Sequence, residues 1–126
     1  KISNTEMENK RKEPFALEER TFNFARDVRL FVKKLPKTIT NAEDIKQVAR
    51  SSGSIGANYI EAQEYTGAKD RIHRMKISRK EAKESRFWLR LLDTGENVPV
   101  EGERGRLVQE SNELMLIFGA IVRKLE

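Results

Sequence analysis

The chain of 126 residues contains no cysteine, one histidine, three prolines and seven glycines. Without cysteine, neither a disulfide framework nor a thiolate metal site is possible, which is compatible with a reducing compartment. No apolar run approaches the roughly 18 residues that cross a bilayer, and the first residues lack the apolar core of a signal peptide. We therefore expect a cytoplasmic protein without a membrane segment.

The scarcity of histidine also limits the possible chemistry. His73 has no Glu three residues before it, so the Glu-x-x-His pairs of di-iron bundles are missing. A lone histidine also argues against a catalytic triad of the usual form. Glu61, Glu81 and Glu84 could be imagined as a carboxylate metal cluster, but we favour a structural role, in which they pair with Arg or Lys side chains or with Asn58. We expect no enzymatic activity, no metal and no cofactor.

The pattern of hydrophobic and charged residues along the chain is helical. Hydrophobic residues make up 37% of the chain and charged residues 36%, which suits long amphipathic helices. Residues 1–14 are polar and without periodicity, and we predict a flexible N-terminal arm there. Residues 15–126 are predicted to form a bundle whose helices cover about 17–35, 40–65, 70–93 and 103–126, with a loop over 94–102. Short links between the helices predict an all-α fold, an antiparallel up-down left-handed four-helix bundle.

Local signals support these helix boundaries and the packing between helices. Pro36 ends the first helix, and Thr40 with Glu43 has the form of a capping box for the second. Each helix carries a core seam at steps of three and four residues. On the third helix this seam consists of Met75, Ser78, Ala82, Ser85, Leu89 and Leu92. Gly53 and Gly56 share one row of the second helix, which predicts that another helix comes close there.

A stripe of cations runs along the third helix. Residues 69–92 hold nine Lys or Arg against three acidic residues. Five of these cations recur at steps of three and four and form the predicted nucleic-acid-binding set: Lys76, Arg79, Lys83, Arg86 and Arg90. Such clustering suggests an anionic partner, and the alternative is a solvated helix face. The nearest aromatic residue, Phe87, lies at the far edge of the stripe, so we expect contacts to phosphates and shape rather than base stacking.

The fourth helix predicts a contact between subunits. Its segment 114–122 is apolar almost all round, whereas a helix at the corner of a monomeric bundle keeps a polar face. The third helix adds a second apolar strip around Trp88. The predicted oligomer interface consists of Trp88, Leu91, Met115, Ile117 and Val122.

Three stretches together resemble a known family: ARSSGSIGANYIEA, KISRKEAKESRFWLRLL and QESNELMLIFGAI. They are similar to the bacterial four-helix-bundle proteins of the 23S rRNA intervening-sequence type, and the resemblance covers about residues 15–125. The positions that carry it are Ser52, Ser54, Ile55, Asn58, Glu61, Glu81, Ala82, Glu84, Trp88 and Leu89. Ala62 departs from the pattern, which usually has glycine after the glutamate of the second helix.

The resemblance implies a basic, homopentameric bundle. The accessory protein of diversity-generating retroelements is a more distant relative, for which nucleic-acid binding and a reverse-transcriptase partner are implied. Two classes of function stay open. The first is a non-catalytic nucleic-acid-binding protein, with structured RNA favoured, that serves as an accessory factor to a retroelement or an rRNA intervening sequence. The second is a protein–protein assembly module without a role in nucleic-acid binding.

Overall fold

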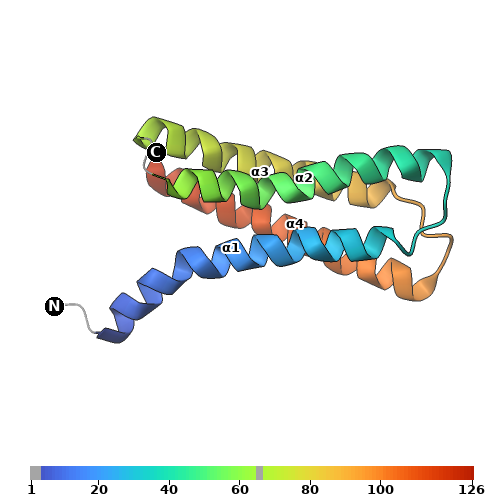
Figure 1. Ribbon diagram of the computed structural model, residues 1–126, viewed down its shortest axis with the longest axis horizontal. Helices are drawn as coiled ribbons and strands as arrows, with labels where there is room; N and C mark the ends of the chain where they lie inside the picture. The colour runs from blue at the N-terminus through green and yellow to red at the C-terminus, as the bar shows by residue number, and fades with distance from the viewer. Residues whose placement is uncertain (1–3, 65–66) are drawn as a thin grey trace.

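The computed structural model describes residues 4–64 and 67–126, with side chains described from Phe15 on. It contains α1 (Asn4–Val32), α2 (Ile39–Gln63), α3 (Ala68–Leu91) and α4 (Val98–Leu125), and no strand in the described ranges. Successive helices run antiparallel and pack against one another, and α1 also contacts α4 (Figure 1). The predicted all-α, antiparallel up-down four-helix bundle is confirmed.

The core forms where the seams of the four helices meet. All six predicted seam positions of α3, from Met75 to Leu92, are at most 1% exposed. Tyr59 of α2 meets Phe118 of α4 edge to face, with ring centroids 5.7 Å apart. Val122 is completely buried in the same cluster. Its place in the predicted oligomer interface is therefore wrong, because Val122 follows Phe118 by four positions and shares its inward-facing row.

The helices α1 and α2 come close at one glycine. A Cβ atom on Gly56 would lie 2.8 Å from the hydroxyl oxygen of Thr21 and 3.9 Å from its backbone carbonyl carbon. The predicted close approach of another helix is therefore confirmed at Gly56. At Gly53 the neighbouring atom belongs instead to the guanidinium of Arg29, at 3.3 Å, so only a flexible side chain approaches there.

Buried serines join α2 to α3. The hydroxyls of Ser51 and Ser85 lie 2.8 Å apart, and the Ser78 hydroxyl donates to the carbonyl oxygen of Ile55 at 2.9 Å. All three serines are inaccessible to solvent. Because each hydroxyl has a partner, the interface carries these polar groups without the cost of an unsatisfied one.

Two predicted helix starts need correction. Thr38, not Thr40, caps α2: it is extended, and its hydroxyl oxygen accepts from the Asn41 amide at 3.0 Å. Glu43, the other half of the predicted capping box, is exposed and lies 3.7 Å from Lys46. The fourth helix begins at Val98 rather than Glu103, because Asn97 accepts from the Val100 amide and a proline lies in the first turn.

The start of α1 also differs from the prediction. The helix begins at Asn4 rather than near Leu17, so it includes residues that we had placed in a flexible arm. Residues 1–3 of that arm lie outside the described residues. The mobility of the arm and the division of the chain at residue 15 stay predictions.

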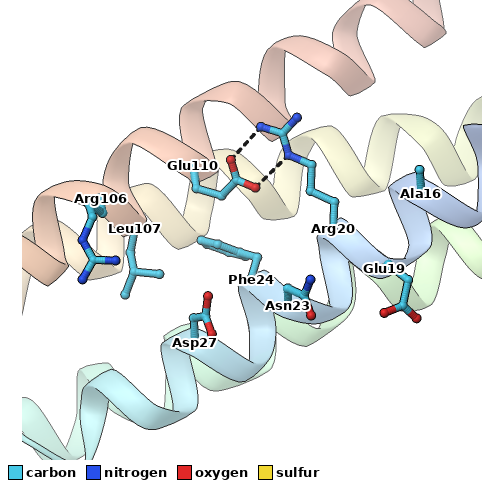
Figure 2. A pocket seen from close by; sticks show the side chains of 9 residues that line it. All are labelled: Ala16, Glu19, Arg20, Asn23, Phe24, Asp27, Arg106, Leu107 and Glu110. Atoms are coloured by element: carbon cyan, nitrogen blue, oxygen red, sulfur yellow. Dashed lines mark hydrogen bonds and ion pairs between the residues drawn. The ribbon is translucent and has the colours of Figure 1, made fainter.

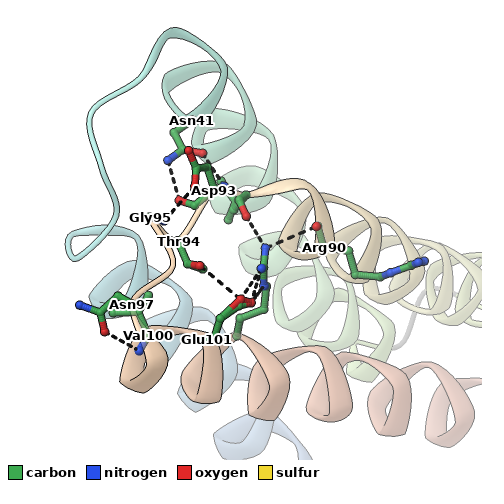
Figure 3. Close-up of polar contacts among 10 residues, drawn as sticks. Asn41, Arg90, Asp93, Thr94, Gly95, Asn97, Val100 and Glu101 are labelled. Atoms are coloured by element: carbon green, nitrogen blue, oxygen red, sulfur yellow. Dashed lines mark hydrogen bonds and ion pairs between the residues drawn. The ribbon is translucent and has the colours of Figure 1, made fainter.

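One buried asparagine connects the two loops at the end of the bundle (Figure 3). The side-chain amide of Asn41 donates to the carbonyl oxygens of Pro36 and Asp93, each at 2.9 Å. Its side-chain oxygen accepts from the Asp93 amide, also at 2.9 Å. The Asp93 carboxylate in turn accepts from the Gly95 amide. Asn41 therefore ties the α1–α2 connection to the α3–α4 connection.

Candidate functional site

The predicted cations follow the border between α3 and α4. The Arg86 guanidinium donates to the side-chain oxygen of Asn112 on α4 at 2.7 Å. A Cβ atom on Gly119 would lie 3.7 Å from the Arg79 side chain and 3.5 Å from the guanidinium of Arg123. Arg79 thus lies against α4 beside Gly119, and Arg86 lies against it at Asn112.

The other three cations point to solvent. Lys76, Lys83 and Arg90 are all exposed. We call the combined surface the basic face and define it by six residues: Lys76, Arg79, Lys83, Arg86, Arg90 and Arg123. Arg123 and the supporting Asn112 could not be identified from the sequence, because only the packing of α4 on α3 places them beside the stripe.

The basic face has no acidic partners among the residues that the structure describes. None of its six cations forms an ion pair with another residue in ranges 15–64 and 67–126. The carboxylates are used on other borders of the bundle, as in the pairs Lys34–Glu103 at 2.6 Å and Arg50–Glu81 at 3.2 Å. Six cations without neutralisation on one side of α3 and α4 produce a positive potential that attracts anions.

Arg104 lies near one end of this face without adding to it. Its guanidinium contacts the carbonyl oxygens of Arg90 and Leu92 and pairs with Glu101. The hydrogen bonds from Arg104 lower the pKa of Glu101 below its ordinary value. Glu101 therefore stays ionised near neutral pH, and its charge cancels that of Arg104.

The opposite side of α3 holds the predicted structural polar residues. Glu81 is nearly buried, and Arg50 of α2 lies within 3.3 Å of both Glu81 and Glu84. Asn58 accepts from the Arg74 guanidinium at 3.2 Å. Glu81, Glu84 and Asn58 thus contact arginine side chains within the bundle, as a structural role requires.

Glu61 differs from the other three predicted structural polar residues. It is exposed, and no partner of its side chain is found among the described residues. Nothing in the described residues supports its assignment as a structural partner, because its side chain points to solvent and Arg74 contacts Asn58 and Asp70 instead. In the described part of the chain, no three His, Asp or Glu side chains are placed to hold a metal ion.

The structure does not gather the predicted oligomer interface into one patch. Leu91 is exposed on α3, while Trp88 and Met115 are half-buried and pack on the core. Ile117 is half-buried and follows Glu110 by seven residues, which places it on the row of α4 that faces α1. Of the five residues, Leu91 alone offers a largely free side chain.

Two grooves flank α1, and they differ in character. The groove toward α4 has a volume of about 360 Å³ and contains charges of both signs, including Asp27 and Arg106 (Figure 2). In it Arg20 donates to both carboxylate oxygens of Glu110, and these hydrogen bonds raise the pKa of Arg20. Because three acidic residues line it against two arginines, this groove offers an anion little attraction.

The groove between α1 and α2 is apolar. It has a volume of about 570 Å³, and its lining includes Phe22, Ile60 and Gly56. Phe22 is 60% exposed and Ile60 44% exposed. The helical pattern of α1 gives no sign of this surface, because its exposed Phe22 lies beside the buried row that contains Phe24 and Phe31.

Comparison with known proteins places these features in context. The sequence matches the family described as 23S rRNA-intervening sequence protein over residues 15–117. A similar crystal structure is that of a protein of unknown function from the S23 ribosomal protein family of Bacteroides thetaiotaomicron. It is 29% identical, with a TM-score of 0.67 and coverage of 83% of this chain and 96% of that chain. No curated protein matches the sequence. None of the helices in the described ranges is long and apolar enough to span a membrane.

Proposed function

Because this chain belongs to the 23S rRNA-intervening sequence protein family, we propose that it is a non-catalytic protein that binds nucleic acid, RNA above all, through its basic face. The observation that carries the proposal is a set of six cations along α3 and α4 that form no ion pair with any side chain in the described part of the chain. RNA is favoured because the family name refers to a sequence within ribosomal RNA. An accessory role for the intervening sequence or for a retroelement, with a reverse transcriptase as a further partner, is part of the proposal.

The dimensions of the basic face suit a phosphate backbone. From Lys76 to Arg90 the helix rises by about 1.5 Å per residue, which gives roughly 21 Å. Over that length several successive phosphates can be contacted. The bond to Asn112 orients the Arg86 guanidinium while leaving it further N–H donors for a phosphate. Affinity then comes mainly from counterion release and carries weak sequence preference.

The test is a salt titration of RNA and DNA binding. Lys76, Lys83 and Arg90 are replaced together by Gln, because all three are exposed and none of their side chains contacts the core. The logarithm of affinity should fall with the logarithm of salt, and the slope should become shallower by about 0.9 for each duplex phosphate contact removed. Binding should weaken alike across sequences, and the far-UV circular dichroism should not change.

A matched variant controls for net charge. Lys33, Lys37 and Lys46 are also exposed but lie outside α3 and α4. Their replacement by Gln removes the same charge and should leave the salt slope intact. If the parent binds neither RNA nor DNA at low salt, or if both triple variants lose affinity equally, the proposal fails. The protein–protein assembly module then takes its place.

We further propose that the protein forms a homo-oligomer, for which the family resemblance implies five subunits. Support comes from the exposed apolar side chains of Phe22, Ile60 and Leu91. Light scattering at micromolar concentration should give a multiple of the 14.6 kDa chain mass. Phe22→Glu and Leu91→Glu, measured separately, identify which of the two surfaces is in contact, since a charge in a buried interface dissociates it. A parent mass of one chain would refute self-association.

A further inference from the structure

Phe87 lies on the outer surface of α3 with 54% of its side chain exposed. Lys83 precedes it by four residues and Arg90 follows it by three, and both are exposed. Residues at these spacings are neighbours on a helix surface, with about 5–6 Å between their Cβ atoms. Phe87 therefore borders two cations at the edge of the basic face, and its side chain is exposed there.

The ring of Phe87 is held in place from one side. It meets the ring of Trp88 edge to face, with centroids 5.1 Å apart and planes at 80°. Trp88 itself is half-buried and packed against the core. Since this contact already restricts the Phe87 side chain, a ligand that uses the ring has less conformational entropy to offset on binding.

The surroundings of Phe87 select for one kind of ligand. The exposed Leu91 follows Phe87 by four residues, so a protein surface on Leu91 would also cover the ring. Such a surface would have to supply partners for Lys83 and Arg90 as well. A uniform duplex offers phosphates to the cations but keeps its bases stacked inside. A nucleotide with an unpaired base brings an anion and a flat aromatic ring together, and base–aromatic stacking tolerates any base.

We propose that Phe87 is a stacking platform for an unpaired base, so that the preferred ligand of the basic face contains single-stranded or looped nucleotides. This inference rests on the proposed nucleic-acid binding and narrows it. The sequence alone predicted that the basic face contacts only the phosphates and the shape of the nucleic acid, whereas this inference adds base stacking.

The test compares two probes of equal phosphate number, a single-stranded oligonucleotide and a blunt RNA duplex. Phe87→Ala should weaken binding of the single strand by roughly 5- to 100-fold, the range typical of one lost base–aromatic contact. Duplex affinity and the salt slope should not change, because Phe87 neutralises no phosphate. Phe87→Trp should retain single-strand binding, whereas Phe87→Leu, which is apolar but not aromatic, should not.

A control variant and a fluorescence measurement complete the test. Phe15 is 62% exposed on α1 and is followed by Glu18 and Glu19, so Phe15→Ala removes an exposed ring outside the basic face and should not affect binding. Trp88 is the only tryptophan of the chain. Its emission should therefore change when a base stacks on Phe87, and it should change with the single strand but not with the duplex.

The possible outcomes distinguish a failure of the stacking role from a failure of nucleic-acid binding by the basic face. A parent that binds neither probe refutes nucleic-acid binding as a whole. A parent that binds both, with Phe87→Ala leaving single-strand affinity intact, refutes the stacking role alone. If Phe87→Leu keeps full affinity, or if Phe87→Ala dissociates an oligomer, the ring serves an apolar protein contact and the stacking role is likewise refuted.

Discussion

Replacing Asn41 by leucine should lower the free energy of unfolding by about 3 kcal/mol, which is the net worth of three typical hydrogen bonds. The side chain is 1% exposed and makes three bonds of 2.9 Å, to Pro36 once and to Asp93 twice. Leucine has a similar volume but can replace none of these bonds. The change is measured by equilibrium denaturation at a fixed protein concentration.

Asn41→Asp should be more damaging at neutral pH. A carboxylate would direct its charge at the carbonyl oxygens of Pro36 and Asp93, which accept hydrogen bonds in the parent. Burial and these oxygens would raise the pKa of the new acid above its unfolded value. As the pH falls, the new acid is therefore protonated in the folded state before it is protonated in the unfolded state. The loss of stability relative to the parent should shrink as the pH falls through the raised pKa. It should be smallest below about pH 4, where the unfolded acid is also protonated.

Asn97→Asp is the matched control for the same chemical change. Asn97 is exposed, and its side-chain oxygen accepts from the Val100 amide at the start of α4. Aspartate keeps this acceptor and places a negative charge at a helix N-terminus, where it is favourable. Stability should stay equal or rise. If Asn41→Leu and Asn41→Asp unfold at the denaturant concentration of the parent, the two loops are not held together by Asn41.

Arg50→Gln should destabilise the bundle by about 3 kcal/mol, because it leaves the Glu81 carboxylate without its cation. The Glu81 side chain is 5% exposed, and removal of one member of a buried ion pair typically costs 3–5 kcal/mol. We expect the lower end of that range, since the Arg50 side chain is itself 55% exposed. The corresponding fall in melting temperature is roughly 10 °C.

Two variants identify burial as the cause. Glu84→Gln removes the other acid that contacts Arg50, but its side chain is 41% exposed, so a change below about 1 kcal/mol is expected. Adding Glu81→Leu to Arg50→Gln removes the buried charge and should restore most of the stability. If the double variant is no more stable than Arg50→Gln, the loss has another source than the unpaired carboxylate.

The interior of the bundle could be predicted from the sequence because it depends on helical periodicity. Phe24, Val28 and Phe31 of α1 are all buried, as is Leu35 just beyond its end, in keeping with their spacing of three and four residues. The stripe from Lys76 to Arg90 is likewise a property of one helix. Both predictions needed only the rise and rotation per residue, which are fixed by the backbone.

Features that depend on contacts between helices could not be predicted in the same way. Asn41 bonds to Asp93, fifty-two positions along the chain, and its own helix gives no sign of that partner. Val122 belongs to a segment that is apolar all round, so its orientation was set by the packing of α4 and not by its pattern. For Phe87, the neighbouring charges were visible in the sequence, but the exposure of the ring and its contact with Trp88 were not.

The buried serines between α2 and α3 determine how the two helices are aligned along their length. A seam that repeats every seven residues permits two helices to slide past each other by a turn or more and still match apolar against apolar. The Ser51–Ser85 and Ser78–Ile55 bonds favour a single offset, because a slip would break both bonds between the helices, at a net cost of about 1 kcal/mol each. The buried serines thus set the register of two helices whose apolar seams would otherwise allow several. They hold α3, and with it the spacing of its cations along the bundle, at one fixed longitudinal position.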